Sequence, residues 1–184
     1  RFKASHVIRA AAAVMLAAFA IITQTGCGDK ELSKTDFALN TSCTITIYGM
    51  SGSEGEAVLD DAFKEIRRYE NMLSRTVEGS DVCNINNAGG QPVEVSDDTI
   101  AVLKLGIEMG DISDGRFDIT VGRLTDLWDF TGDDPHVPEQ AAIDEAVKSV
   151  SYRNIDIEGN TVRLADPGAA VDLGGVAKGY IADR

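Results

Sequence analysis

The sequence has little of the residue types from which several common kinds of site are built. It contains three cysteines, two histidines and one tryptophan in 184 residues. Three cysteines are too few for a disulfide framework, and none stands in a CxxC pair or close to a histidine, which excludes the usual zinc motifs. Cys43 and Cys83 are expected to be buried free thiols, with a disulfide between them as the alternative that an exported protein would permit.

Positive charge is also scarce. The chain has 17 Lys and Arg residues against 30 Asp and Glu residues, a net charge of −13. Residues 1–26 hold three basic residues and no acidic one, so the remainder has 14 basic against 30 acidic residues, a net charge of −16. Such a surface repels phosphate backbones and anionic lipid headgroups. Nucleic acid is therefore not expected as a partner, and neither is electrostatic attachment to a membrane.

The longest apolar run is too short for a permanent transmembrane helix, which needs about 20 residues. It covers residues 10–22, follows two basic residues and ends in small and polar residues before Cys27. This order is typical of a signal peptide. The Gly26-Cys27 pair resembles the bacterial lipobox, although Gln24 replaces its usual aliphatic residue. The resemblance implies cleavage after residue 26 and a lipid anchor at Cys27, on the extracytoplasmic face of the cell membrane; a plain signal peptide cut nearby is the alternative.

Hydrophobic periodicity predicts an α+β fold that follows a polar tether at residues 27–36. A strand is expected over residues 37–48 and a long amphipathic helix from Ser53 to Leu73, and residues 74–95 are expected to be irregular. Further helices are predicted from residue 97 to about 110, around 124–128 and after Pro138. Short strands are predicted at residues 155–157, 162–164 and 169–173, with a hairpin turn at Gly159-Asn160 between the first two.

The stretch Asp172–Tyr180 (DLGGVAKGY) passes from a predicted strand through two glycines into a helix. Backbone N–H groups at a helix start carry partial positive charge, glycines allow a phosphate to approach the main chain, and Lys178 adds a full charge. This arrangement suits a diphosphate. It is neither a Walker A motif nor a GxGxxG motif, and a Gly-Gly turn before a helix is also ordinary loop geometry.

The same stretch resembles the signature of the FAD:protein FMN transferases, the ApbE-type flavin-trafficking lipoproteins. Three earlier stretches resemble other blocks of that family in the same order: Leu39–Thr41, Leu73–Asn86 and Asp114–Phe130. The resemblance covers nearly all of residues 37–184. It implies that these residues form the N-terminal portion of the FAD-binding FMN transferase domain, an α+β fold of the ApbE type (T-fold-like) that is truncated at its C-terminus.

The resemblance also implies individual roles. Lys178 would hold the diphosphate during catalysis, and Gly175 would offer its carbonyl oxygen to Mg²⁺. Thr76 stands where many relatives have an aromatic residue stacked on the flavin, a loss expected to weaken FAD retention by about 0.5–1.5 kcal/mol. The full set of residues implied to contact FAD is Leu39, Thr76, Arg116, Phe117, Asp118, Asp172 and Lys178.

These residues also have purely structural interpretations. Asp118 could cap a turn, Asp172 could end a strand beside a basic partner, Lys178 could be solvated and Phe117 could belong to the core. Trp128 and Phe130 are expected to be packing residues rather than flavin contacts.

The implied reaction is Mg²⁺-dependent transfer of FMN from FAD to a Thr or Ser hydroxyl of a target redox protein, with release of AMP. Such an enzyme needs no nucleophile of its own, which agrees with the lack of a Ser/His/Asp or Cys/His arrangement. The alternatives are hydrolysis of FAD to FMN and AMP, and storage or delivery of FAD without catalysis. In the family the other Mg²⁺ ligands and a histidine come from a part not included in this sequence, so this segment alone is expected to be inactive.

Overall fold

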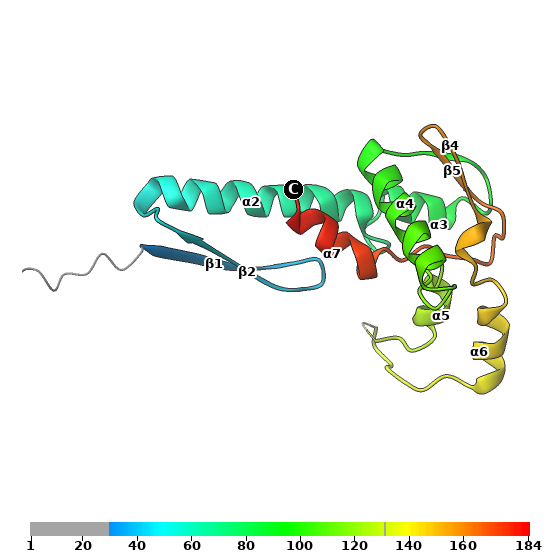
Figure 1. The fold of residues 1–184 in the computed structure, drawn as a ribbon. Helices are drawn as coiled ribbons and strands as arrows, with labels where there is room; N and C mark the ends of the chain where they lie inside the picture. The colour runs from blue at the N-terminus through cyan, green and yellow to red at the C-terminus, as the bar shows by residue number, and fades with distance from the viewer. Residues whose placement is uncertain (1–29, 131) are drawn as a thin grey trace, which may run out of the picture. The chain divides into compact units, whose positions relative to one another are not determined.

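A computed structural model of the chain describes residues 30–130 and 132–184 (Figure 1). The described residues form two compact units, a smaller one of residues 30–35 and 44–59 and a larger one of residues 36–43 and 60–184. The expected signal peptide, residues 1–26, and the expected anchor Cys27 lie outside the described residues. None of the helices described here is both long and apolar enough to cross a membrane.

The smaller unit contains most of a β-hairpin and the beginning of a long helix. Strands β1 (Glu31–Ala38) and β2 (Thr41–Tyr48) pair in a two-stranded sheet, and α2 (Gly52–Leu73) starts in this unit. The helix packs closely, because a Cβ atom at Gly55 would stand 2.9 Å from Cδ2 of Leu32. Glycine at this position therefore permits the close approach.

The predicted tether is wrong over its second part, because residues 31–36 belong to β1. Exposed and half-buried positions alternate along β1, but the alternating residues include Lys34 and Asp36 in place of apolar side chains. The single strand predicted over residues 37–48 is instead the end of β1, a two-residue turn and β2. Both turn residues, Leu39 and Asn40, have positive φ angles, +54° and +55°, as the tightest hairpin turns require.

The larger unit holds the remaining helices. The helices after α2 are α3 (Asp81–Asn87), α4 (Asp97–Ile112), α5 (Gly122–Asp126), α6 (Gln140–Val147) and α7 (Gly174–Ala182), with a 3₁₀ turn, η1, at Tyr152–Asn154. The predicted helices before residue 113 are confirmed, as α2 and α4. Serines cap the N-termini of α3 and α4: Ser80 Oγ accepts from Cys83 N at 3.0 Å, and Ser96 Oγ accepts from Thr99 N at 3.2 Å.

A three-stranded antiparallel sheet packs against α3. Strands β3 (Val93–Glu94), β4 (Ile155–Glu158) and β5 (Thr161–Leu164) lie in the order β3-β5-β4. Gly159, with a φ of +59°, makes the predicted hairpin turn between β4 and β5. The predicted α+β class is therefore confirmed, whereas α3 and β3 lie in the region that was expected to be irregular.

The predicted strand at residues 169–173 is an extended segment with only one β-bridge, from Ala170 to Val121. Gly122 N donates to Ala170 O at 2.8 Å, and Asp172 N donates to Ile119 O at 2.7 Å. A Cβ atom at Gly122 would stand 2.7 Å from Ala170 O. The segment is thus held firmly against residues 119–122 just before α7 begins.

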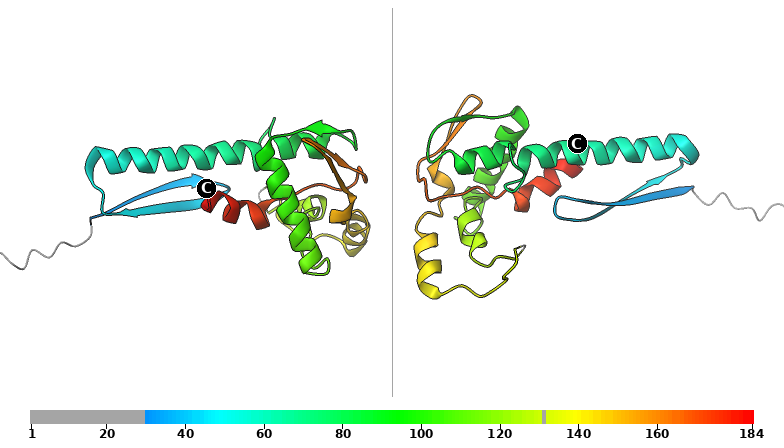
Figure 2. Two further views of the ribbon diagram at one scale, coloured as in Figure 1. Left: turned by 45° about the horizontal axis from the view of Figure 1, so that its top comes forward. Right: turned by 180° about the vertical axis from the view of Figure 1, so that it is seen from behind.

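The core of the larger unit gathers the last turns of α2 with α3, α4, the sheet and α7. Helix α7 lies beside α4 (Figure 2). Two glycines of α4 allow close packing on its other neighbours: a Cβ atom at Gly106 would stand 2.6 Å from Ile119, and one at Gly110 would stand 2.7 Å from Tyr152. Cys43 and Cys83 are free thiols, as predicted, but they are half-buried rather than buried.

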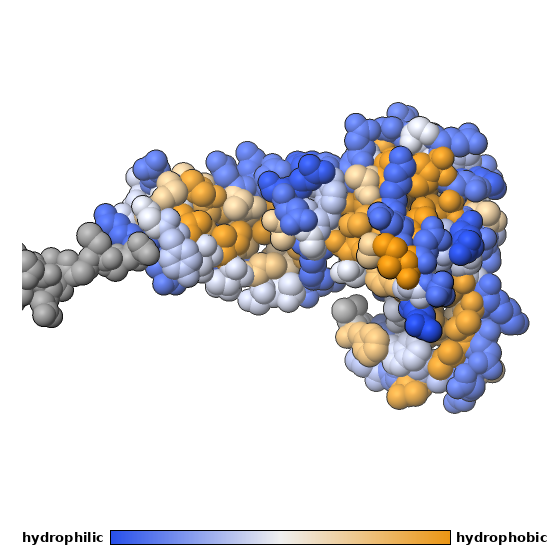
Figure 3. All heavy atoms as spheres, viewed as in Figure 1, coloured by the Kyte–Doolittle hydropathy of each residue, from blue (hydrophilic) through white to orange (hydrophobic). Residues whose placement is uncertain are grey.

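Apolar and charged residues are interspersed on the face of the molecule drawn in Figure 3. The larger unit nevertheless exposes some large apolar side chains, among them Ile112 at 70% and Phe130 at 71% of their surface. Phe130 borders the pocket described next.

Candidate functional site

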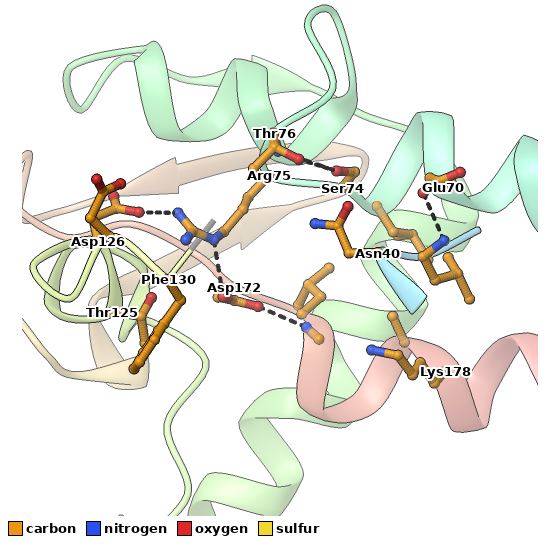
Figure 4. Close-up of a pocket in the computed structure, with 16 residues that line it drawn as sticks. Asn40, Glu70, Ser74, Arg75, Thr76, Thr125, Asp126, Phe130, Asp172 and Lys178 are labelled. Carbon is orange, nitrogen blue, oxygen red and sulfur yellow. Dashed lines mark hydrogen bonds and ion pairs between the residues drawn. The ribbon is translucent and has the colours of Figure 1, made fainter. Parts of the chain in front are cut away.

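A pocket of about 420 Å³ lies in the larger unit, where four segments distant in the sequence converge (Figure 4). Its size falls within the usual range for small-molecule sites, roughly 300–1,000 Å³. The lining residues come from the β1–β2 turn, the end of α2, the loop that follows it, the region of α5 and the start of α7. They are Leu39, Asn40, Glu70, Leu73, Ser74, Arg75, Thr76, Thr125, Asp126, Asp129, Phe130, Asp172, Leu173, Gly174, Ala177 and Lys178.

The β1–β2 turn is fastened to α2 by one hydrogen bond. Leu39 N donates to Glu70 Oε1 at 2.7 Å, and Glu70 lies one turn before the end of α2. In a two-residue hairpin turn, some backbone N–H and C=O groups are not paired by the hydrogen bonds between the strands and need other partners. The glutamate supplies an acceptor and so places Leu39 and Asn40 on the pocket wall.

The loop after α2 is shaped by the Ser74 side chain. Ser74 Oγ accepts from Thr76 N at 3.2 Å and from Val77 N at 3.3 Å, and Ser80 Oγ donates to the Ser74 carbonyl oxygen. Serine commonly makes such local turns, because its hydroxyl competes for backbone groups. The turn carries Arg75 and Thr76 to the pocket.

Arg75 connects two carboxylates from different segments across the pocket floor. Its Nη1 atom lies 2.5 Å from Asp126 Oδ1, and its Nε atom lies 3.0 Å from Asp172 Oδ2 (Figure 4). The second oxygen of Asp172, Oδ1, accepts from Gly174 N at 2.9 Å, at the first residue of α7. Asp172 is therefore oriented through both of its oxygens.

Lys178 is the other cation of the pocket, and its situation differs from that of Arg75. Its side chain extends from α7 toward the pocket (Figure 4). No hydrogen bond or ion pair joins it to any residue within 30–130 or 132–184. Four carboxylates, those of Glu70, Asp126, Asp129 and Asp172, also line the pocket. Of the two pocket cations only Lys178 has no ion-pair partner among the described residues, so an anionic ligand would meet an uncompensated positive charge there.

Helix α7, which carries Lys178, is anchored on its far side by Tyr180. The Tyr180 hydroxyl donates to Asp98 Oδ1 of α4 at 2.9 Å, and its ring meets that of Tyr69 edge to face with centroids 6.0 Å apart. Burial of the phenol and this hydrogen bond raise the pKa of Tyr180. The opposite side of α7, which carries Lys178, lines the pocket.

The structure brings together four of the residues implied by the family resemblance: Leu39, Thr76, Asp172 and Lys178 all line the pocket. They come from three motifs that are far apart in the sequence. Gly175 lies beside the lining residue Gly174 in the first turn of α7, and its backbone is exposed.

The other three implied residues do not line the pocket. Arg116 is exposed in the loop after α4, and Phe117 is half-buried behind α7. Asp118 Oδ1 accepts from Thr120 N at 2.8 Å and Oδ2 accepts from Tyr152 N at 2.9 Å, so its carboxylate joins two loops. This is the turn-capping role that the sequence left open as the alternative for Asp118.

Sequence analysis missed several pocket residues. Glu70, Arg75 and Asp126 act through contacts with distant segments, for which no local pattern exists. Phe130 was expected to be a packing residue, which is wrong: its ring stacks beside the half-buried Trp128 at 6.3 Å, with an interplanar angle of 13°, but stays largely exposed. An aromatic side chain in a loop rich in Asp and Gly was the one available signal.

The described residues do not form a magnesium site by themselves. No group of three or more Asp, Glu, His or Cys residues among them is arranged to hold a metal ion. Asp126 and Asp172 are ion-paired with Arg75, and Glu70 accepts a backbone hydrogen bond. The Gly175 carbonyl could contribute at most one of the several oxygen ligands that Mg²⁺ requires.

Comparison with known proteins gives consistent matches. The model of the ApbE family matches residues 39–184. An FAD:protein FMN transferase of Treponema pallidum is 29% identical over 164 residues, which are 84% of this chain and 45% of the relative. One of Salmonella typhimurium is 36% identical over 153 residues, 79% of this chain and 44% of the relative.

Solved structures agree with these matches. The ApbE protein of Thermotoga maritima superimposes with a TM-score of 0.76 at 34% identity, covering 84% of this chain and 51% of that protein. The flavin transferase ApbE of Vibrio cholerae gives a TM-score of 0.75 at 24% identity, covering 84% of this chain and 52% of that protein, a likeness of fold. This chain thus spans about half the length of the relatives it matches.

Proposed function

Because this chain belongs to the ApbE family, we propose that its protein binds FAD as a substrate and transfers the FMN half to a hydroxyl group of a target protein. The observation that best supports this is the pocket itself, where Lys178 extends from α7 without an ion-pair partner among the described residues and Asp172 is held at the start of the same helix. Relatives named FAD:protein FMN transferase match the chain along most of its length.

The proposed reaction is a phosphoryl transfer. The oxygen of a Thr or Ser hydroxyl of the target attacks the FMN-side phosphorus of FAD and loses its proton. A new P–O bond forms while the bond from that phosphorus to the bridging oxygen breaks, and AMP leaves with the bridging oxygen. Charge stabilisation and positioning contribute most of the catalysis in such reactions. The pocket therefore needs cations and orienting groups rather than a nucleophile.

Four pocket residues have a chemical task in this reaction. Lys178, as a mobile ammonium group near the α7 N-terminus, would neutralise the diphosphate. A carboxylate accepts hydrogen bonds and repels phosphate, so Asp172 would accept from an N–H or O–H group of the nucleotide. Leu39 and Thr76 would contact the flavin side. The described residues do not assemble a set of Mg²⁺ ligands, and the requirement for Mg²⁺ stays a prediction.

A single assay separates the proposed transfer from its alternatives. The intact protein is incubated with FAD, Mg²⁺ and a candidate redox subunit, and the mixture is resolved on a denaturing gel. Flavin fluorescence that stays on the subunit is the expected result. Free FMN would indicate hydrolysis, intact bound FAD would indicate storage, and no binding of flavin would contradict all three. Parallel samples with EDTA test the need for a divalent cation, since transfer that persists would contradict it.

We also propose that the protein is held at the extracytoplasmic face of the cell membrane by acyl chains on Cys27. The support is the sequence before this cysteine. More than one acyl chain is generally needed for stable anchoring by lipidation alone. A labelled fatty acid should become attached to the wild-type protein and not to Cys27→Ala, without a change in FAD binding; equal labelling of the two proteins, or none of wild type, would contradict the proposal.

A further inference from the structure

We propose that Arg75 is a positioning residue that makes Asp172 a neutralised and oriented hydrogen-bond acceptor for the nucleotide, and that Arg75 is not itself a ligand of the diphosphate. This inference rests on the proposed binding of FAD in the pocket. Arg75 and Asp172 come from different segments, and none of the local patterns that predicted Asp172 predicted its partner.

The electrostatics of the pocket supports this role. Four carboxylates line the pocket together with two cations, so its side chains carry a net negative charge that would repel a diphosphate. Arg75 lies within 3.0 Å of two of these carboxylates at once, those of Asp126 and Asp172. Its charge is therefore compensated by its own neighbours. Lys178 remains as the cation that can meet a phosphate, and Arg75 reduces the repulsion that the phosphate would otherwise meet.

Geometry supports the same role. Asp172 Oδ2 forms an ion pair with Arg75 Nε at 3.0 Å, while Oδ1 accepts from Gly174 N at 2.9 Å. Two such contacts fix the rotation of the carboxylate group, and each oxygen still has a second lone pair for another donor. The side chains of Arg75 and Asp172 are only 26% and 29% exposed, so water competes weakly for these contacts. A ligand N–H or O–H group thus meets an acceptor that is already in place, which lowers the entropic cost of binding.

Arginine suits this position better than lysine. The planar guanidinium offers Nε and Nη donors in a fixed fork, and here two of them reach two different carboxylates. A lysine ammonium is a single point charge on a flexible chain and cannot reproduce this arrangement with the same rigidity. Arg75→Lys is therefore expected to keep the charge of the pocket and lose much of the orientation of Asp172.

A double-mutant cycle tests the inference, because residues that act through one another have non-additive effects. FAD affinity of the intact protein is measured by flavin fluorescence or calorimetry for wild type, Arg75→Gln, Asp172→Asn and the double variant. Each single change should weaken binding about tenfold, a size typical of partly screened charge pairs at a binding site. The double variant should lie within about threefold of Asp172→Asn alone, whereas independent effects would multiply to about a hundredfold.

A matched control is available on the same stretch of chain. Arg67, on α2, forms an ion pair with Asp36 and does not line the pocket. Arg67→Gln should change FAD affinity less than twofold, as expected for an exposed pair outside the site. Should Arg75→Gln fail to fold by circular dichroism, the same cycle is run with Arg75→Lys, which is expected to weaken FAD binding less than about tenfold and to show the same non-additivity.

The outcomes separate this inference from the proposed function. Wild-type protein that binds FAD, with multiplicative effects of the two changes, would overturn the role of Arg75 and leave the function standing. Arg75→Gln binding FAD as tightly as wild type would have the same consequence. Wild-type protein without affinity for FAD would overturn both.

Discussion

The ring of Phe117 lies directly behind Gly175, so that a Cβ atom at position 175 would stand 2.8 Å from Phe117 Cε2 and 3.1 Å from Cζ. Real Cβ atoms do not approach other carbons so closely. The contact joins the loop after α4 to the first turn of α7. Phe117, implied to contact FAD, and Gly175, implied to bind Mg²⁺, therefore lie together although only Gly175 is near the pocket. Phe117 supports the helix that carries Lys178.

This contact predicts opposite effects for alanine at two glycines of α7. Gly175→Ala should lower the free energy of unfolding by about 1 kcal/mol, because the strain against Phe117 outweighs the better helix propensity of alanine. Gly179→Ala is the control, since a Cβ atom there meets nothing within 4 Å. That variant should be more stable than wild type by about 0.5–1 kcal/mol. Urea denaturation measures both, and equal shifts in the two variants would contradict the steric argument.

The helices that the sequence predicted best are those whose apolar side chains recur over several turns. Helices α2 and α4 bury one face each, at Leu59 and Phe63 and at Ile100 and Leu103, and this period is visible without any tertiary information. The strand β1 was missed because its half-buried positions include Lys34 and Asp36. Helix α3 was missed because seven residues, of which only Val82 and Ile85 are buried, show no period.

A second prediction concerns Asn86, which holds the extended segment before α7. Its Nδ2 atom donates to Val171 O at 2.9 Å, and its Oδ1 atom accepts from Val171 N at 2.7 Å. Asn86→Ala would leave both backbone groups of a fully buried residue without a partner, at a cost of about 2–4 kcal/mol. FAD affinity should fall as well, since Asp172 follows directly.

The neighbouring Asn87 provides the control for this prediction. It is exposed on the same helix, and its amide contacts only the sulfur of Cys83, at 3.2 Å. Asn87→Ala should change stability by less than about 0.5 kcal/mol, as most exposed substitutions do. Thermal or urea denaturation of the two variants would contradict the assignment if Asn86→Ala were no less stable than Asn87→Ala.

A third prediction concerns alkaline pH. The buried Tyr152 hydroxyl donates to Asp111 Oδ1 at 2.7 Å. This hydrogen bond to a carboxylate raises the pKa of Tyr152, and burial of the phenol acts in the same direction. A pKa raised by folding contributes stability that is complete below the unfolded value, roughly pH 10 for tyrosine, and is lost as pH rises through the folded value.

The measurement for this prediction is the urea midpoint as a function of pH. Wild-type protein should lose stability above about pH 10, and Tyr152→Phe should lose less over the same range, although other tyrosines and lysines also titrate there. Below pH 9 the variant should show no added pH dependence. Identical slopes for the two proteins in the alkaline range would show that Tyr152 is not linked to folding.

The candidate site was predictable where a residue belongs to a local pattern with its own chemistry. Asp172 and Lys178 stand in one stretch that the sequence predicts to pass from a strand through glycines into a helix, and the structure places both at one pocket. Arg75 was not predictable, because its role depends on a contact with Asp126, 51 residues later, and on another with Asp172. Asp118 was expected to line the FAD pocket, whereas its carboxylate accepts backbone hydrogen bonds from Thr120 and Tyr152.

The last prediction tests the uncompensated charge of Lys178. In the intact protein, Lys178→Gln should weaken FAD binding about tenfold or more at low salt, because a lost contact with a charged group costs about 1.5–3 kcal/mol. Lys178→Glu should weaken it further, since the pocket already holds four carboxylates.

Raising the ionic strength should weaken FAD binding to wild type more than to the glutamine variant, because salt screens an exposed charge. Lys104→Gln, an exposed lysine of α4 outside the pocket, removes the same net charge and should bind FAD as wild type does. If Lys178→Glu kept wild-type affinity for FAD, the diphosphate would have to lie elsewhere, and the assignment of this pocket would fail with it.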